Sequence, residues 1–197
     1  MRDFSLISTL GTTGALADYF DTENINYFCV TGFDLSQTKS FVIGLVRTIE
    51  CEDGPFDDEN ISTGLGYLDV IDPGDILLVQ GSQKWAYFGE LMSTISHQRN
   101  LAAAVIIGKT RDSRFTQDFF PVWSNGYTPI DIKGRGRVKS VGVPVLVEGN
   151  KVTEGMICAA DNDGILFFDS LTEIQYKDIE KILLHEQNIK DLISSGK

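Results

Sequence analysis

Residues 72–107 read DPGDILLVQGSQKWAYFGELMSTISHQRNLAAAVII, and this stretch decides the fold. A Pro-Gly turn opens it, and the continuous apolar run 76–79 that follows is typical of a strand buried on both faces. After Gly89 the period changes to that of an amphipathic helix, with apolar side chains at Leu91, Met92, Ile95 and Leu101. A second apolar run, 102–107, ends the stretch. This order predicts a strand–helix–strand unit.

Weaker signals extend outward from this unit. Before it, we expect a helix over 14–20 capped by Thr12 or Thr13, a strand over 41–49, an acidic loop over 51–60 and a helix through 65–70. After it, we expect short strands within 120–123, 138–147 and 156–168, then a final amphipathic helix over 172–194. No low-complexity linker divides the 197 residues. We therefore predict a single domain over 1–197, with its core at 13–170 and a terminal helix at 172–194.

The charge balance narrows the classes of partner. The chain has 28 Asp and Glu against 17 Lys and Arg, a net charge of -11, so its average surface repels nucleic acid and anionic lipid. The three cysteines show no C-x-x-C spacing, which argues against a zinc site or a disulfide framework. No window approaches the roughly 18 apolar residues of a membrane span. We expect a cytoplasmic protein with no nucleic-acid or membrane partner.

The tetrapeptide Gly89-Glu90-Leu91-Met92 is the first candidate for a binding site. Free backbone N–H groups at a helix N-terminus bind carboxylates or phosphates, and Gly89 has no side chain to block the approach. An ordinary turn glycine is the alternative explanation.

The second candidate is Lys109-Thr110-Arg111-Asp112, directly after the second apolar run. Residues at the carboxyl end of a strand in an α/β sheet face the crevice where ligands bind. Arg111 can clamp a carboxylate with two hydrogen bonds, and Asp112 can give a hard oxygen ligand to Mg²⁺. The alternative is a surface ion pair or a turn.

Other patterns favour structural explanations. The positive charges at Lys133, Arg135, Arg137 and Lys139 alternate, which favours an edge strand protected by charge over contact with an acidic neighbouring subunit or an anion. The stretch Asp161-Asn162-Asp163-Gly164 lacks the glutamate of a calcium loop and predicts a hairpin turn. The sequence has no dinucleotide or phosphate loop, no G-x-S-x-G and no H-E-x-x-H. Nucleotide-dependent chemistry, serine hydrolysis and zinc proteolysis are therefore disfavoured.

A series of motifs resembles the RraA-like family, which contains regulators of ribonuclease activity and 4-hydroxy-4-methyl-2-oxoglutarate aldolases. In chain order the motifs are 72–79, Gly89-Glu90-Leu91-Met92, Arg111-Asp112, 119–129, Val143-Pro144-Val145 and 160–165. The most specific is Gly89 followed, after 21 residues, by Arg111-Asp112. The resemblance covers most of the chain.

The resemblance implies an α/β fold of the swivelling β/β/α type, with N- and C-terminal helices. It also implies a homotrimer or a hexamer with sites between subunits, to which the neighbouring chain adds an acidic residue, with Glu186 as a candidate. The implied activity is that of a class II, metal-dependent lyase. Such an enzyme cleaves a C–C bond in small 2-oxo acids to give pyruvate, as an oxaloacetate decarboxylase or a 4-hydroxy-4-methyl-2-oxoglutarate aldolase does.

The resemblance also implies roles for individual residues. Asp112 resembles the Mg²⁺ or Mn²⁺ ligand, and Arg111 resembles the residue that holds the pyruvyl unit. Leu91 and Met92 would give backbone N–H groups to the substrate carboxylate, and Glu90 would support the metal's water shell. These roles suit the chemistry, because C–C cleavage next to a 2-oxo acid leaves a pyruvate enolate that a divalent metal and a fixed positive charge stabilise.

Phe115 departs from the aldolase pattern, which has a second carboxylate at this position. Retro-aldol cleavage needs a base for the hydroxyl proton, whereas decarboxylation needs only enolate stabilisation. Phe115 therefore weakens the aldolase hypothesis more than the decarboxylase hypothesis. If so, Phe115→Glu should change the ratio of the two activities.

The competing hypothesis is a non-catalytic regulator of ribonuclease activity, an acidic protein that masks a basic protein partner. Its support is the net charge of -11. A purely electrostatic partner would be lost as salt rises. A methyltransferase is rejected, because no glycine-rich cofactor loop follows a strand.

Overall fold

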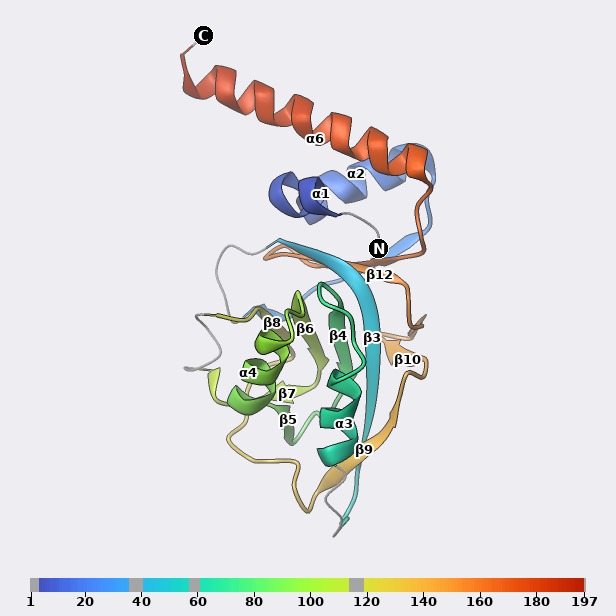
Figure 1. The fold of residues 1–197 in the computed structure, drawn as a ribbon, viewed down its shortest axis with the longest axis vertical. Helices are drawn as coiled ribbons and strands as arrows, with labels where there is room; N and C mark the ends of the chain where they lie inside the picture. Colours follow the sequence, from blue (N-terminus) through green and yellow to red (C-terminus); the bar gives the residue numbers. More distant parts are fainter. Residues whose placement is uncertain (1–3, 36–40, 57–60, 114–118, 197) are drawn as a thin grey trace.

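The computed structural model describes residues 4–35, 41–56, 61–113 and 119–196 of the chain (Figure 1). Its helices are α1 (Ser5–Leu10), α2 (Thr13–Glu23), α3 (Ile61–Leu68), α4 (Glu90–Gln98) and α6 (Glu173–Ser194). The first strands are β1 (Tyr27–Val30), β2 (Asp34–Leu35), β3 (Val42–Asp53), β4 (Ile76–Gln80), β5 (Ala86–Phe88), β6 (Ala103–Ile107) and β7 (Lys109–Thr110). The later strands are β8 (Val122–Ser124), β9 (Gly136–Val141), β10 (Val145–Val147), β11 (Asn150–Val152), β12 (Ile157–Ala160) and β13 (Ile165–Phe168). No helix among the described residues is long and apolar enough to cross a membrane.

A mixed sheet of nine strands, curled into a half-barrel, forms the centre of the molecule. Its strand order is β1-β13-β12-β3-β4-β6-β8-β2, and β9 pairs with β3 as well. The strands β3, β4, β6 and β8 run parallel, whereas β12, β13 and β1 add an antiparallel half. This arrangement is the α/β fold with terminal helices that the sequence predicts, in one domain.

The parallel strands bury both faces, which explains their continuous apolar sequences. In β4, Leu77 and Val79 belong to one apolar cluster, while Ile76 and Leu78 belong to the cluster on the opposite face. The first face packs against α3 and α4, and the β10–β11 hairpin adds side chains to the second. A third cluster joins α1, α2 and α6 to the antiparallel half of the sheet. These terminal helices lie together at one end of the molecule (Figure 1).

One edge of the long strand β3 is shared by two partners. β12 pairs with β3 over residues 42–45, and β9 pairs with it over residues 49–53. At the gap between them, the Thr48 backbone N–H donates to Glu154 Oε1 at 3.0 Å, and the Gly142 N–H donates to the Thr48 carbonyl at 2.9 Å. The Glu154 carboxylate thus satisfies a strand amide at a position that no strand reaches.

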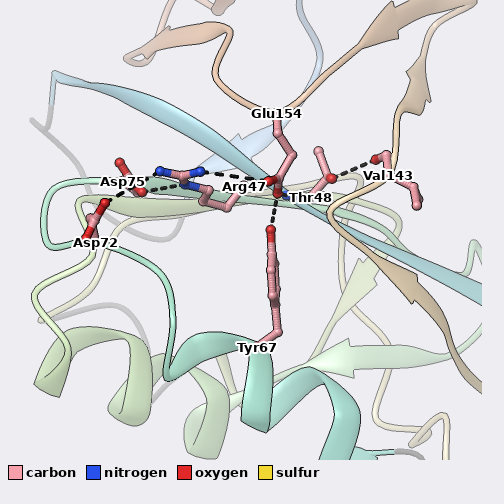
Figure 2. Close-up of polar contacts among 7 residues, drawn as sticks. All are labelled: Arg47, Thr48, Tyr67, Asp72, Asp75, Val143 and Glu154. Carbon is pink, nitrogen blue, oxygen red and sulfur yellow. Dashed lines mark hydrogen bonds and ion pairs between the residues drawn. The ribbon is translucent and has the colours of Figure 1, made fainter.

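Glu154 also links helix α3 to this junction (Figure 2). The Tyr67 hydroxyl, near the end of α3, donates to Glu154 Oε1. On the other side of Glu154, Arg47 Nε donates to Asp75 Oδ2 at 2.6 Å, and Arg47 Nη1 lies 3.8 Å from Glu154 Oε2. The cluster therefore connects β3, the turn before β4, the turn before β12 and α3.

The structure corrects several expectations. The acidic loop expected over 51–60 begins as strand, because β3 continues to Asp53 and pairs with β9. The sequence did not predict helix α1 or the short strands β1, β2, β5, β7 and β11. The final helix was predicted correctly as α6, which begins with a capping box between Thr172 and Gln175. Thr12, rather than Thr13, caps α2.

Candidate functional site

A small parallel sheet brings the two candidate motifs together. Strand β5 pairs with β7, and the Arg111 N–H donates to the Phe88 carbonyl at 3.0 Å, so Gly89 and Arg111 are neighbours across this sheet. The segment after β8 runs along the same sheet, where the Ile132 N–H donates to the Ala86 carbonyl at 3.1 Å. Three chain segments therefore converge at the N-terminus of α4.

A pocket of about 270 Å³ lies at this convergence. The six residues singled out from the sequence line it, namely Gly89, Glu90, Leu91, Met92, Arg111 and Asp112. Four further lining residues were not predicted, namely Leu65, Tyr87, Asp131 and Ile132. A pocket of this size suits a small metabolite, since pockets for drug-sized ligands span about 300–1,000 Å³.

Arg111 is held by two carboxylates. Its Nη1 lies 2.5 Å from Asp131 Oδ2, and its Nε lies 3.3 Å from Asp112 Oδ2. All three side chains are about one-third exposed, so the group faces the pocket and solvent. The guanidinium is thus fixed at the pocket wall with a defined orientation.

Gly89 makes the close approach of Asp112 possible. A Cβ atom at Gly89 would lie 2.7 Å from Asp112 Oδ2 and 2.9 Å from Arg111 Cγ. The Glu90 N–H, the first amide of α4, lies 3.4 Å from the same Asp112 oxygen. Asp112 itself has a positive φ of 57°, a conformation that Asp tolerates better than most residues. The glycine therefore has a steric role here beyond that of a turn residue.

The first turn of α4 presents its N-terminal end to the pocket. Gly89 is the N-cap and offers no capping side chain, while Asp112 Oδ2 accepts from the first amide, at Glu90. Met92 is buried, whereas Leu91 is 64% exposed, so Leu91 does not share the buried side of the amphipathic pattern expected for this helix. Glu90 is exposed beside Asp112. A helix N-terminus next to an arginine is a favourable place for a carboxylate.

The donor set of the pocket fits a hydrated divalent cation. Asp112 and Glu90 bring hard carboxylate oxygens to the pocket lining, and Asp112 Oδ2, like Asp131 Oδ2, also contacts Arg111. The described residues contain no group of three His, Cys, Asp or Glu side chains that could hold a metal by themselves. Mg²⁺ usually keeps several waters and is bound through one or two carboxylates, so it suits this set better than Zn²⁺ does.

The basic residues near β9 form structural ion pairs. Arg137 Nε lies 2.6 Å from Glu52 Oε1, and Lys139 Nζ lies 2.7 Å from Glu50 Oε1 across the β3–β9 pair. Arg135 lies over the Trp85 ring, with its Cζ 5.5 Å from the ring centroid. These contacts support the structural explanation over an anion site.

Two larger hollows lie elsewhere on the described surface. One, of about 470 Å³ between α2 and α6, has mainly acidic polar groups, with Asp18, Glu23, Asp178 and Glu186 beside Lys181. The other, of about 490 Å³, lies between α1 and the start of β4. Glu186 lines the first hollow and does not line the pocket of its own chain, which leaves its expected role toward a neighbouring subunit a prediction.

Sequence reasoning missed Asp131 because its signal is weak. Asp131 follows the parallel strand β8, at the same edge of the sheet as Arg111 and Asp112. A carboxylate after a parallel strand is the signal that could have identified it. Phe115, the position that departs from the aldolase pattern, lies outside the described residues.

The sequence matches a known protein family. The model of the RraA-like family, described as Aldolase/RraA, matches residues 13–167. Protein DlpA of Legionella pneumophila is 27% identical over 135 residues, which cover 66% of this chain. The match spans only 22% of that protein's length.

Solved structures share the fold. The RNA-processing inhibitor RraA from Thermus thermophilis has a TM-score of 0.66 at 22% identity, covering 80% of this chain and 94% of that one. RraAS2 of Streptomyces coelicolor is an unusual member of the RNase ES inhibitor RraA protein family. It has a TM-score of 0.74 at 20% identity, covering 98% of this chain and 97% of that one. At these identities the likeness establishes the fold.

Proposed function

Because the chain belongs to the RraA-like family, whose model matches residues 13–167, we propose that its pocket binds a small 2-oxo acid and cleaves a C–C bond to release pyruvate. The family description unites aldolases with RraA proteins. The observation that carries the lyase proposal is the meeting of Arg111, Asp112 and the N-terminus of α4 in one pocket.

The chain's residues supply charge complementarity for such a reaction. The first-turn amides of α4, at Leu91 and Met92, would receive the substrate carboxylate, because the helix dipole favours negative charge there. Arg111, oriented by Asp131, would hold the 2-oxo group and stabilise the negative charge that grows on its oxygen. Both groups are fixed before the substrate binds, so little reorganisation is needed during the reaction.

Asp112, with Glu90 beside it, would hold Mg²⁺ or Mn²⁺ through bound waters. The cation supplies a Lewis acid when it is bound. In this arrangement Gly89 is required, since any side chain there would meet Asp112.

We further propose that the chain works as a homotrimer or a hexamer. The pocket is open to solvent, and the exposed side chains Leu91 and Ile130 lie on or next to its lining. Apolar groups of this kind at a pocket mouth suit coverage by a neighbouring subunit.

The test is pyruvate release from oxaloacetate and from 4-hydroxy-4-methyl-2-oxoglutarate, with Mg²⁺ and with EDTA, by the parent chain and by Asp112→Ala. Metal-dependent release that the substitution abolishes supports the lyase. The ratio of the two rates tests the argument from Phe115, which still rests on sequence alone.

No release by a folded, assembled protein would favour the second candidate function, a protein-binding regulator. The net charge of -11 favours a basic protein partner for such a regulator. Its binding would weaken steeply as salt rises.

A further inference from the structure

Two carboxylates of the pocket, Asp112 and Asp131, share one arginine. Both line the pocket, and both contact Arg111. Their side chains are almost equally exposed, at 38% and 34%, so access to solvent does not distinguish them. Their polar contacts differ, however, and the difference assigns a separate task to each carboxylate.

Both carboxylate oxygens of Asp131 are engaged at short distances. Oδ1 accepts from the Lys133 backbone N–H at 2.7 Å, and Oδ2 lies 2.5 Å from Arg111 Nη1. The backbone is fixed as well, because Asp131 forms a parallel β-bridge with Ala86 of β5. Asp131 is therefore a well-anchored partner for one end of the guanidinium.

The contacts of Asp112 are longer. Its Oδ2 lies 3.3 Å from Arg111 Nε and 3.4 Å from the Glu90 backbone nitrogen. Within the described part of the chain, no hydrogen bond or ion pair uses Asp112 Oδ1. A carboxylate in this state can still bind a divalent cation, directly or through the cation's waters.

Without Asp131, Arg111 would pair more closely with Asp112. The two residues are adjacent in the chain, and Arg111 Nε already contacts Asp112 Oδ2. Arginine and carboxylate groups favour two parallel hydrogen bonds, which would engage both oxygens of Asp112. The guanidinium would then also repel a cation that approaches the same carboxylate. The short contact between Arg111 Nη1 and Asp131 opposes this pairing.

We propose that Asp131 is a positioning residue, which holds the Arg111 guanidinium away from Asp112 and so keeps Asp112 open to the divalent cation. This inference rests on the proposed function of the same pocket, and it adds a residue that controls metal affinity without touching the metal. Among the described residues, no hydrogen bond or ion pair uses Arg111 Nη2, which leaves this nitrogen for the substrate. Asp131 thus divides the pair, with Arg111 for the substrate and Asp112 for the cation.

Metal affinity tests this inference without any measurement of catalysis. Binding of Mn²⁺ to the assembled, substrate-free protein is followed by the electron paramagnetic resonance signal of the free ion. Asp131→Asn keeps the size of the side chain and removes the charge that holds Arg111. We expect the affinity for Mn²⁺ to fall roughly tenfold, as is usual when a group that orients a metal site is lost.

Asp69→Asn is the matched control. It also removes one carboxylate from an ion pair with an arginine, Arg99, and it lies outside the pocket lining. This variant should keep the parent's affinity for Mn²⁺. A thermal melt of each variant checks that it is folded.

A second background separates positioning from other effects. In Arg111→Gln there is no guanidinium to hold away, so the further change Asp131→Asn should alter the affinity for Mn²⁺ by less than about twofold. If Asp131 were itself a metal ligand, or acted only through its charge, the same change would weaken binding in both backgrounds.

The outcomes distinguish this inference from the proposed function. If the parent does not bind Mn²⁺, the proposed metal-dependent function is wrong and the inference falls with it. If the parent binds Mn²⁺, Asp112→Ala abolishes binding and Asp131→Asn binds as tightly as the parent, the function stands and the inference is overturned. An equal loss from Asp131→Asn in the parent and in Arg111→Gln also overturns it, because the effect would then not pass through Arg111.

Discussion

At the scale of single residues, the candidate site depends on one missing side chain. Gly89 has an extended backbone with φ of -158°, which any residue can adopt, so the requirement for glycine comes from space alone. Asp112 Oδ2 and Arg111 Cγ occupy the volume that a Cβ would fill. A substitution of Gly89 therefore tests the steric effect of an added side chain without adding backbone strain.

We expect Gly89→Ala to displace Asp112 and Arg111 and to lower the rate of pyruvate release about 100-fold, because small misplacements of catalytic groups are costly. The measurement is kcat/KM together with Mg²⁺ affinity. Gly14→Ala is the control, since the nearest atom to its Cβ, Thr12 Oγ1, is 3.9 Å away. Equal activity of the two variants would contradict the role given to Gly89.

The same residues show how far the sequence predicts the site. Gly89, Arg111 and Asp112 follow or precede clear elements, so their pocket could be anticipated from chain order. Asp131 and Tyr87 reach the pocket through tertiary contacts of short strands and turns, and these leave no period in the sequence. The sequence thus predicts the lining residues that lie at the ends of regular elements, and it misses those that reach the pocket through tertiary contacts.

At the scale of elements, helix α3 is weak by itself and depends on its contacts. It has eight residues, two of which, Gly64 and Gly66, disfavour helix. The Tyr67 hydroxyl ties its end to Glu154, and Arg99 Nη1 donates to the Leu68 carbonyl at 3.4 Å. The two glycines differ in their surroundings, which allows a matched test.

Gly66→Ala should stabilise the protein by up to about 1 kcal/mol, because a Cβ at Gly66 meets no described atom within 4 Å. Gly64→Ala should destabilise it by about 1–3 kcal/mol, because its Cβ would collide with the Tyr87 hydroxyl. Urea unfolding of both variants measures the difference. Changes of the same sign would show that α3 does not pack on Tyr87 as described.

The pairing of β3 with β9 predicts a pH dependence. The hydrogen bond from Lys139, followed by that from Ser140, lowers the pKa of Glu50 below its ordinary 4.5. A carboxyl whose pKa is lower in the folded state stabilises the fold above its unfolded pKa, and this stabilisation is lost as pH falls through the folded value.

Glu50→Gln should therefore lower the free energy of unfolding by about 1 kcal/mol or less at neutral pH, since Lys139 is half exposed. At a pH well below the lowered pKa of Glu50, the substitution should have no effect on the free energy of unfolding. The free energy of unfolding in urea, compared between parent and variant at both pH values, checks this. A cost that is the same at both values would argue that the loss comes from packing rather than charge.

Among the elements, long periodic segments were predicted well and short ones poorly. The strands β4 and β6 are continuous apolar runs, and most apolar residues of the helices α4 and α6 follow the helical period. The acidic end of β3, Cys51-Glu52-Asp53, resembles a loop because the charge of Glu52 is paired with Arg137 of β9, which lies far along the chain. Tertiary pairing overrode local composition there.

At the scale of the whole molecule, helix α6 is longer than the surface that it covers. Its first half contributes Ile179 and Leu183 to the core beside α1 and α2. Its second half extends past these helices (Figure 1), and Leu192 and Ile193 are 54% and 71% exposed. An amphipathic helix with an uncovered apolar side suits contact with another copy of the chain.

We expect the parent chain to run at three or six times its chain mass in light scattering coupled to size exclusion. Leu192→Glu with Ile193→Glu should shift it toward a smaller species while the far-ultraviolet helical signal is kept. Leu146→Glu, on the β10–β11 hairpin and 56% exposed, is the control. If the double variant keeps the parent's mass, α6 is not part of the assembly.

The shared edge of β3 has a consequence for amide hydrogen exchange in the folded protein. Most amides of a central sheet exchange their hydrogens with solvent only when strands separate. The Thr48 amide is protected instead by the Glu154 side chain, which Tyr67 and Arg47 hold in place. This amide loses its hydrogen-bond partner when the Glu154 carboxylate turns away, without separation of the strands. Because Tyr67 of α3 holds Glu154, deuterium uptake at Thr48 would report the loosening of α3 before the strands separate. Exchange at one strand amide would thus measure the mobility of a helix that lines the pocket.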